Sequence, residues 1–374
     1  MTPHQGGVNT ENSNPSGSQQ RALDGRAVAV VDGVAQPAVG QILLRGVGTG
    51  YLLIEYIEET RGKMLSSTWF EKHEDVKLRT NFFRDLSRIL LSLARIPLPR
   101  IGSFVVDNDG FLQLTNRPLT LEIQELENEE IATDIPRDYT YLMVDSYITD
   151  VLAFHDNRLR YQPNAINDTG DYIYQASALS AMRAIFPLYF QRKFRRRPFI
   201  FTLTDLHQSN IFIDKDWHIV SLVDLEWACS QPIEMFQPPY WLTNKAVDQI
   251  DSEEYDKIRT EFLDILAAEE ERSDGTGFRD LKLSSLIKQA WKMGTFWCSL
   301  ALSSPTGLFA IFEKHLQPQL LRNVQTMVLS IRLCLGTGRK TSWAFWHGNC
   351  QIGRNMMNGF EKRLTMTFWR INNS

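Results

Sequence analysis

The sequence predicts an α+β fold in which a reduced, β-rich amino-terminal lobe precedes a mainly helical carboxy-terminal lobe. Apolar residues recur every three or four positions in several long segments after residue 74, which is typical of amphipathic helices. Short apolar runs on either side of turn residues, such as those flanking Asp214–Asp216, predict strands and hairpins. With 374 residues, 43% of them hydrophobic and 22% charged, the chain has enough apolar material for two lobes.

Composition divides the chain into four predicted segments. Residues 1–25 contain few large apolar side chains and predict a disordered tail, and residues 26–60 contain short apolar runs that predict strands. Residues 61–321 predict the carboxy-terminal lobe. Residues 322–374 contain eight Lys or Arg and one acidic residue, Glu361, and predict a poorly ordered basic tail. Such a tail either binds an anionic surface or results from mis-splicing or a frame shift.

Several elements of the carboxy-terminal lobe follow from local patterns. Periodic apolar residues predict five helices, over Glu74–Leu93, Tyr141–Phe154, Ala176–Phe190, Asp251–Arg272 and Leu281–Leu302. The turn signal Asp107–Gly110 predicts a hairpin over Ile101–Leu114. We interpret the polar run His155–Arg158 as a capped helix end. We interpret Arg117 as a partner in a structural ion pair, with a substrate contact as the alternative.

The stretch that carries the most chemical information is Phe201–Trp227, FTLTDLHQSNIFIDKDWHIVSLVDLEW. It predicts a strand, a tight loop over Thr204–Asn210, and then a hairpin of two further strands. Because the hairpin folds the chain back, we expect Asp224 to return close to Asp205 and Asn210, at one end of a short sheet. Asp and Asn are also common turn residues, so an ordinary hairpin is the alternative for any one of them.

These three residue types suit phosphoryl transfer. A carboxylate can receive the proton of an attacking hydroxyl group, and oxygen ligands can hold Mg²⁺ against the phosphates of a nucleotide. The chain has an aspartate, an asparagine five positions later and an aspartate fourteen positions after that. This spacing resembles that of the catalytic loop and metal-binding aspartate of protein-kinase-like folds. The resemblance implies Asp205 as the candidate base, and Asn210 and Asp224 as the candidate metal ligands.

The phrases TDLHQSNIFID and LVDLEWA resemble the motifs HGDLHPGN and IDWE of the aminoglycoside phosphotransferase family. TNRPLTL, TDIPRD, HDNRLRYQPNAIND and PPYWLT are similar to a fungal branch of that family, and the resemblance covers roughly Gly50 to Leu321. It implies a protein-kinase-like fold, ATP and Mg²⁺ as cofactors, and a small-molecule hydroxyl group as the phosphate acceptor. It also implies that His207 supports the loop and that Glu226 orders the acidic cluster.

The amino-terminal segment contains a second possible nucleotide contact. Gly46–Gly50 lacks a complete phosphate-loop motif, and we interpret the apolar run after it as a hinge strand. The resemblance implies that the backbone of Glu55, Tyr56 and Ile57 holds adenine. In this family a phosphate-gripping lysine precedes the hinge, whereas the first lysine of this chain is Lys63. The resemblance therefore implies that residues 26–60 are the remnant of a truncated amino-terminal lobe, together with its hinge.

Two other functions remain open at the level of sequence. Leu203 and Thr204 replace the family's His-Gly, and a β-branched residue tolerates fewer backbone conformations than glycine. With the absent lysine, this favours a pseudoenzyme or truncated product that retains the large lobe as a binding module. Nucleic-acid binding through Arg192–Arg197 and the basic tail is opposed by the net charge of −4. We interpret the arginine run as a solvated helix end.

Composition also bears on location and partners. No apolar run is long enough to span a membrane, and no secretory segment is recognisable. The four cysteines have no metal-binding spacing, which fits a reducing compartment. We therefore expect a cytoplasmic protein with a small-molecule acceptor and with neither a nucleic acid nor a membrane as partner.

Overall fold

A computed structural model describes residues 56–272 and 281–322, together with the backbone of four short strands near the amino terminus. The strands pair antiparallel as β1 (Val30–Val31) with β2 (Val34–Ala35) and β3 (Val39–Gln41) with β4 (Leu52–Ile54). The chain divides into two compact units, Met1–His315 and Leu316–Ser374. The predicted tail over residues 1–25 lies outside the described residues, as does the predicted basic tail beyond Arg322.

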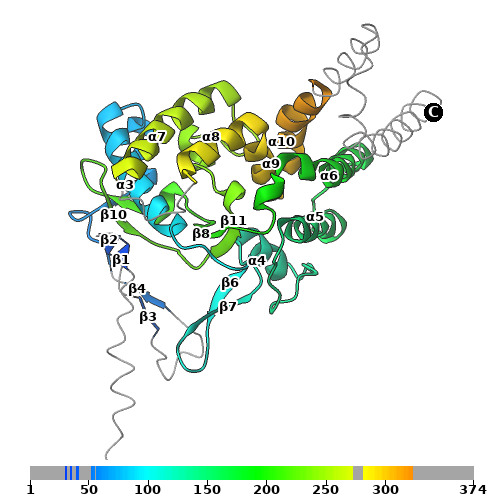
Figure 1. Ribbon diagram of the computed structural model, residues 1–374, viewed down its shortest axis with the longest axis horizontal. Coiled ribbons are helices and arrows are strands. Elements are labelled where there is room, and N and C mark those ends of the chain that lie inside the picture. The colour runs from blue at the N-terminus through cyan, green and yellow to red at the C-terminus, as the bar shows by residue number, and fades with distance from the viewer. Residues whose placement is uncertain are drawn as a thin grey trace, which may run out of the picture. The chain divides into compact units, whose positions relative to one another are not determined.

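The described chain mixes helices with small two- and three-stranded sheets, so the predicted α+β class is confirmed at that level (Figure 1). The helices are α2 (Ser66–Lys72), α3 (Val76–Ala94), α4 (Leu121–Asn128), α5 (Val144–Tyr161), α6 (Thr169–Tyr189), α7 (Ser252–Arg272), α8 (Leu283–Met293), α9 (Thr295–Leu302) and α10 (Leu308–Ile311). Shorter helical turns are η1 (Arg192–Phe194), η2 (Gln208–Asn210), η3 (Ile233–Met235), η4 (Tyr240–Thr243) and the π-helical η5 (Phe312–Leu316). The remaining strands are β5 (Lys63–Met64), β6 (Ser103–Val106), β7 (Leu112–Asn116), β8 (Phe199–Leu203), β9 (Ile211–Ile213), β10 (Ile219–Leu222) and β11 (Ala228–Pro232).

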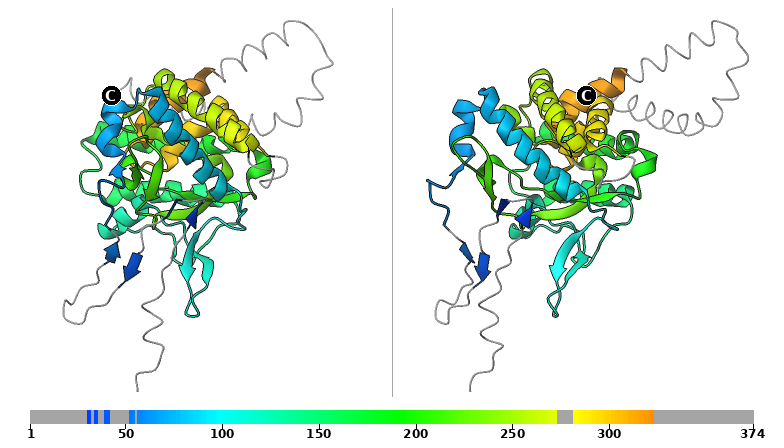
Figure 2. Two further views of the ribbon diagram at one scale, coloured as in Figure 1. Left: turned by 90° about the vertical axis from the view of Figure 1, so that its left-hand side faces the viewer. Right: turned by 60° about the vertical axis from the view of Figure 1, so that its left-hand side comes forward.

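Helices α3 and α7 lie side by side and form one wall of the core (Figures 1 and 2). Their predicted periodicities are confirmed, because the apolar residues that recur at three and four are mostly buried, and the others, among them Leu78 and Ile258, are half-buried. Phe83 of α3 meets Phe262 of α7 edge to face, with ring centroids 5.3 Å apart. The side chain of Asp75 caps α3 by accepting hydrogen bonds from the backbone of Lys77 and Leu78. Asp251 accepts from two backbone amides in the first turn of α7 in the same way.

The interpretation of His155–Arg158 as a helix end is wrong, because α5 continues to Tyr161. His155 is buried, and its Nε2 lies 2.8 Å from the carbonyl oxygen of Leu302. Asn157 donates to the carbonyl oxygen of Ala132 at 2.9 Å. These polar side chains are satisfied by distant segments, so they can occupy a buried helix interior.

Two further helix boundaries differ from the expectation. Helix α6 begins at Thr169, before the predicted start at Ala176, because Asp168 accepts a hydrogen bond from the backbone of Asp171 and caps the helix. The predicted helix over Leu281–Leu302 is two helices, which are separated at Gly294, where φ is +82°. A left-handed residue ends one helix and allows the next to start in a new direction.

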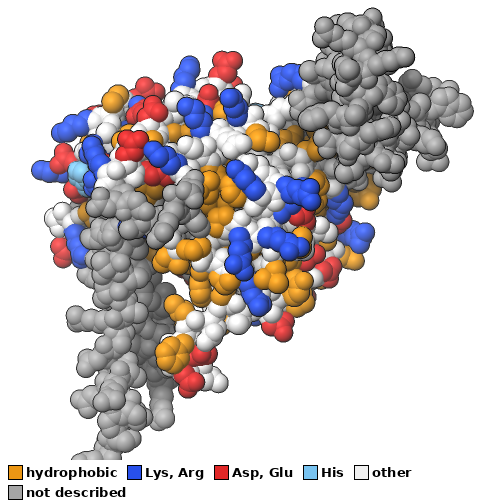
Figure 3. Space-filling model, viewed as in Figure 1, with side chains coloured by type: hydrophobic (Ala, Val, Ile, Leu, Met, Phe, Trp, Pro, Cys, Tyr) orange, Lys and Arg blue, Asp and Glu red, His pale blue; other side chains and the backbone are white. Residues whose placement is uncertain are grey.

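The predicted hairpin about Asp107–Gly110 is confirmed as β6 and β7, and it projects from the neighbouring elements (Figures 1 and 2). Asp107 Oδ1 accepts from the backbone of Asp109 and Phe111, which closes the turn locally. Apolar and acidic side chains share its tip (Figure 3). Arg117, just after β7, is buried and forms an ion pair with Glu127, as the structural interpretation predicted.

The segments that carry the candidate site belong to two sheets. Strand β8 pairs antiparallel with β11, whereas β9 pairs with β10 and with β5. The expectation of one short sheet is therefore wrong, although the predicted β9–β10 hairpin is present. The described part of the chain contains no helix with the length and apolar character that crossing a membrane requires.

Candidate functional site

The candidate site lies on a segment that leaves the β8–β11 sheet and returns to it. Leu203 at the end of β8 stands opposite Ala228 at the start of β11. One step further, the backbone amide and the hydroxyl group of Thr204 both donate to the carbonyl oxygen of Trp227, at 2.9 and 2.5 Å. The two ends of the segment between β8 and β11 are thus joined by a side-chain hydrogen bond that a glycine at position 204 cannot make.

Asp205 is held by Asn210 across the tight loop. The side-chain amide of Asn210 donates to the backbone oxygen and to the carboxylate Oδ2 of Asp205, each at 3.0 Å. The backbone amide of His207 also donates to the Asp205 carbonyl oxygen, at 2.9 Å. Asn210 itself is 8% exposed. A buried amide with two acceptors on one residue gives the Asp205 side chain a defined position.

His207 and Trp241 both make contacts within or against the loop. Nδ1 of His207 lies 3.1 Å from the hydroxyl oxygen of Ser209. The indole Nε1 of Trp241 donates to the carbonyl oxygen of Leu206 at 2.9 Å, and its ring lies 6.0 Å from the His207 ring. These contacts are local and structural in kind, which is what the supporting role inferred for His207 requires.

Asp224 reaches the loop through the β9–β10 hairpin. Leu222 is paired with Ile211, and the backbone amide of Val223 donates to the carbonyl oxygen of Asn210 at 3.0 Å. Asp224 follows directly and is exposed, with φ at +55°. A left-handed conformation is uncommon for residues other than glycine, and Asp is one of the types that tolerate it. The hairpin therefore ends with Asp224, directly after the residue whose backbone amide is bonded to Asn210.

The electrostatics of the loop favour a proton acceptor. Burial raises the pKa of the Asp205 carboxyl above its ordinary value, and the charge of Asp224 raises it further. The hydrogen bond from Asn210 and the neighbouring His207 act in the opposite direction. For His207 itself, burial lowers the pKa and the Asp205 charge raises it. A carboxylate with a raised pKa is a better general base than an ordinary surface aspartate.

The oxygen atoms at this site are of the type that Mg²⁺ prefers. Asn210 Oδ1 accepts one hydrogen bond, from Ser209 Oγ at 3.2 Å, which leaves a second lone pair for a cation. Asp224 follows Val223, whose backbone amide is bonded to the backbone oxygen of Asn210, and its side chain is exposed. Within residues 56–272 and 281–322, no cluster of three or more His, Cys, Asp or Glu could hold a metal ion. Mg²⁺ is commonly bound by one or two carboxylates, waters and substrate phosphates, so the donor set present is compatible with it.

The remaining predicted residues stand apart from this cluster. The hydrogen-bonded cluster in the described chain consists of Asp205, His207, Ser209 and Asn210, so it includes neither Tyr56 nor Ile57. Tyr56 follows β4 and is 79% exposed, and Ile57 is half-buried. Glu226 is exposed and lies in the chain between Asp224 and β11. Glu55 lies outside the described residues.

Glu122 and Tyr240 were missed by the sequence analysis. Burial raises the pKa of the Glu122 carboxyl, and the charges of Glu125 and Asp205 raise it further. Burial also raises the pKa of Tyr240, with Glu122 and Asp205 contributing. Both residues therefore lie within electrostatic reach of Asp205. The capping sequence Thr120-Leu121-Glu122 was a signal for a helix start, but nothing local linked it to a loop 83 positions away.

Comparison with known proteins adds no family assignment. No protein-family model matches the chain, and no curated protein or solved structure shows significant similarity to it.

Proposed function

We propose that the protein is a phosphotransferase of the protein-kinase-like, aminoglycoside phosphotransferase type, which transfers the γ-phosphoryl group of ATP to a hydroxyl group of a small molecule. Asp205 is the base in this proposal. The observation that carries it is the arrangement of the Asp205 carboxylate, held 3.0 Å from the Asn210 amide, with Asp224 returned beside Asn210 by the β9–β10 hairpin.

The transfer assigns a defined step to Asp205. Its carboxylate takes the proton of the acceptor hydroxyl group as the acceptor oxygen forms a bond to the γ-phosphorus. The bond between that phosphorus and the bridging oxygen breaks, ADP leaves with the electron pair, and the proton passes from Asp205 to solvent. The products are a phosphate monoester, ADP and one proton. The raised pKa of Asp205 supports this assignment, because it increases the affinity of the carboxylate for the proton.

Asn210 and Asp224 are the residues proposed to hold Mg²⁺. The ion would neutralise charge on the phosphate oxygens of ATP. Asn210 serves two purposes, because its amide nitrogen orients Asp205 while its Oδ1 faces away from that contact. Glu226 and His207 are proposed to support the site, and the backbone of Glu55, Tyr56 and Ile57 to contact adenine.

Nucleotide binding and turnover test the proposal separately. Millimolar Mg-ATP should raise the unfolding temperature of the wild-type protein. A ligand at a hundred times its dissociation constant adds about 2.7 kcal/mol to the free energy of unfolding. Asp224→Ala should lose this temperature shift. Asp205→Asn should retain the shift but form ADP at least about a hundredfold more slowly in the presence of a panel of small alcohols.

Asp216→Asn is a matched control, because Asp216 lies in the turn at the opposite end of the β9–β10 hairpin. This variant should retain both the Mg-ATP-induced shift of the unfolding temperature and the wild-type rate of ADP formation. Unchanged ADP formation in Asp205→Asn would show that the base is assigned wrongly. The absence of any Mg-ATP shift in the wild-type protein would remove the phosphotransferase proposal altogether.

A second candidate function is a nucleotide-binding protein without turnover. Lys63, the first lysine of the chain, lies in β5, and its Nζ is 3.5 Å from a carboxylate oxygen of the exposed Glu59. It is therefore engaged outside the Asp205 loop. A Mg-ATP shift that depends on Asp224, with no ADP formation above that of Asp205→Asn, would favour this alternative.

A further inference from the structure

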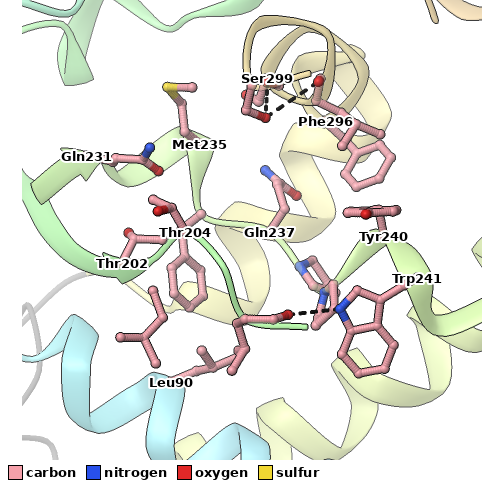
Figure 4. Close-up of a pocket in the computed structure, with 17 residues that line it drawn as sticks. Leu90, Thr202, Thr204, Gln231, Met235, Gln237, Tyr240, Trp241, Phe296 and Ser299 are labelled. Atoms are coloured by element: carbon pink, nitrogen blue, oxygen red, sulfur yellow. Dashed lines mark hydrogen bonds between the residues drawn. The ribbon is translucent and has the colours of Figure 1, made fainter. Parts of the chain in front are cut away.

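A cavity of about 150 Å³ opens beside the Asp205 loop (Figure 4). Its walls come from β8, β11, α9 and the segment over η3 and η4, with Leu90 contributed by α3. Thr204 and Leu206, the two neighbours of Asp205 in the chain, both line it. A ligand in this cavity would therefore lie against the loop that carries Asp205.

The described lining contains no Asp, Glu, Lys, Arg or His side chain. Aromatic rings and aliphatic side chains make up most of the wall, with Phe296 and Tyr240 on one side and Thr202 and Gln231 on the other (Figure 4). Transfer of a cation from water into such a surface is unfavourable unless a carboxylate compensates its charge. The lining is therefore suited to a neutral ligand.

Three residues that line the cavity each have a buried side-chain oxygen without a hydrogen-bond partner, namely Thr202 Oγ1, Gln237 Oε1 and Ser299 Oγ. Ser299 is 3% exposed, and Gln237 lies between the two walls (Figure 4). The Gln237 amide nitrogen is already used, since it donates to the carbonyl oxygen of Glu234 at 2.9 Å. Gln237 Oε1 can only accept a hydrogen bond, so the ligand must supply the donor. Buried oxygens without partners are destabilising until such a group is bound.

We infer that this cavity binds a neutral alcohol whose apolar part is about the size of one ring, and that it does not bind a polycation. An apolar cavity of about 150 Å³ is large enough for a benzene ring. The hydroxyl group of the ligand donates to Gln237 Oε1 and exchanges hydrogen bonds with the hydroxyl groups of Thr202 and Ser299. The inference rests on the proposed function in one respect, that a second hydroxyl group of the bound alcohol, directed to Asp205, is the phosphate acceptor.

A second cavity of about 30 Å³ shares Gln231, Met235 and Ser303 with the first and is lined also by Glu122. Burial raises the pKa of the Glu122 carboxyl. This disfavours the charged form, so the nearby carboxyl is poorly suited to attract a cation into the larger cavity.

Direct binding measurements on the full-length protein without ATP test the inference. Fluorine NMR titration compares para-fluorobenzyl alcohol with para-fluorotoluene, which lacks the hydroxyl group, and with para-fluorobenzylammonium, which adds a charge. The alcohol should bind at least about fivefold more tightly than the toluene, the effect of one or more gained hydrogen bonds. It should bind at least about tenfold more tightly than the cation.

Two variants assign the binding to this cavity. Ser299→Ala and Thr202→Val each remove one unpartnered hydroxyl group with little change of volume, and each should weaken alcohol binding about threefold to tenfold while leaving toluene binding unchanged. Ser87→Ala and Thr243→Val are the matched controls, because Ser87 Oγ and Thr243 Oγ1 are also buried without partners but do not line the cavity. Both controls should bind the alcohol as the wild-type protein does.

The outcomes separate this inference from the proposed function. Absence of alcohol binding, equal binding of the cation, or the same loss in the two controls would overturn the inference, whatever the result with Mg-ATP. Alcohol binding that persists in Asp205→Asn while ADP formation is lost would support both the alcohol-binding cavity and the proposed phosphotransferase activity. Alcohol binding without any Mg-ATP shift would support the binding site and reject the phosphotransferase.

Discussion

The Asn210 side-chain amide donates hydrogen bonds to both the backbone oxygen and the carboxylate Oδ2 of Asp205, each at 3.0 Å. One buried residue thus fixes both the path of the loop and the direction of the carboxylate. The same residue directly precedes β9, and its backbone oxygen accepts from Val223. Asn210 therefore closes the loop by two hydrogen bonds and connects it to the hairpin by a third.

Replacement of Asn210 by alanine is expected to destabilise the protein. Asp205 loses two hydrogen bonds, and a partly buried carboxylate loses its amide donor, so the free energy of unfolding should fall by about 1 to 3 kcal/mol. Urea denaturation measures this change. Asn81→Ala is the control, because the Asn81 amide donates one hydrogen bond, to the backbone oxygen of Asp216 at the hairpin turn, and its Oδ1 accepts only a long one, from Arg84 at 3.5 Å. An equal fall in the free energy of unfolding in the two variants would show that the hydrogen bonds from Asn210 to Asp205 stabilise the protein no more than that of Asn81 does.

Glu234 is expected to make stability depend on pH. It is 1% exposed, and burial raises its pKa from 4.5 to about 7, against the opposing effect of hydrogen bonds from Gln191 and the charges of Lys193 and Arg195. The folded protein therefore binds more protons than the unfolded chain between these two values. The free energy of unfolding should fall as the pH rises through this window, by up to about 3 kcal/mol, and should show no further change from this group above about pH 7.

Glu234→Gln tests this dependence. The glutamine can still accept from the backbone amide of Gln191, which donates to the carboxylate at 3.1 and 3.2 Å, but it does not ionise. The difference in unfolding free energy between variant and wild type should therefore increase from about pH 5 to about pH 8. The exposed Glu71→Gln should show no such trend. A constant difference across the range would contradict the raised pKa of Glu234.

The ion pair between Arg79 of α3 and Glu261 of α7 is expected to stabilise the contact between these helices. Arg79 Nε lies 2.9 and 3.1 Å from the two carboxylate oxygens, and Nη2 lies 2.7 Å from Oε2. Both side chains are partly buried, so solvent screens the pair less than it screens surface pairs. A double-mutant cycle with Arg79→Ala and Glu261→Ala should give a coupling energy of about 1 to 2 kcal/mol.

The Lys63–Glu59 pair provides the comparison. Its two charged atoms are 3.5 Å apart and both side chains are mostly exposed, so the same cycle there should give little or no coupling. Equal coupling for the two pairs would mean that the geometry of the Arg79 pair adds nothing to the stability of the helix contact.

The sequence by itself determined the elements whose signals are local. The turn at Asp214 was predictable because its side chain accepts hydrogen bonds from the backbone of Asp216 and His218, residues only two and four positions away. Helices α3 and α7 were predictable because one apolar stripe specifies a helix wherever it packs. The closeness of Asp205, Asn210 and Asp224 followed from the hairpin between them.

Tertiary structure decided the features that depend on residues distant in sequence. Helix α5 continues through His155 because the Leu302 carbonyl, 147 positions away, satisfies the imidazole. Strand β8 pairs with β11 rather than with β9, so the site spans two sheets. The uncharged cavity beside Asp205 brings together Thr202, Gln237 and Ser299, which have no common local pattern. Burial and partner choice arise only when the chain has folded, and these two effects determine the pKa of Asp205 and the chemistry of the cavity.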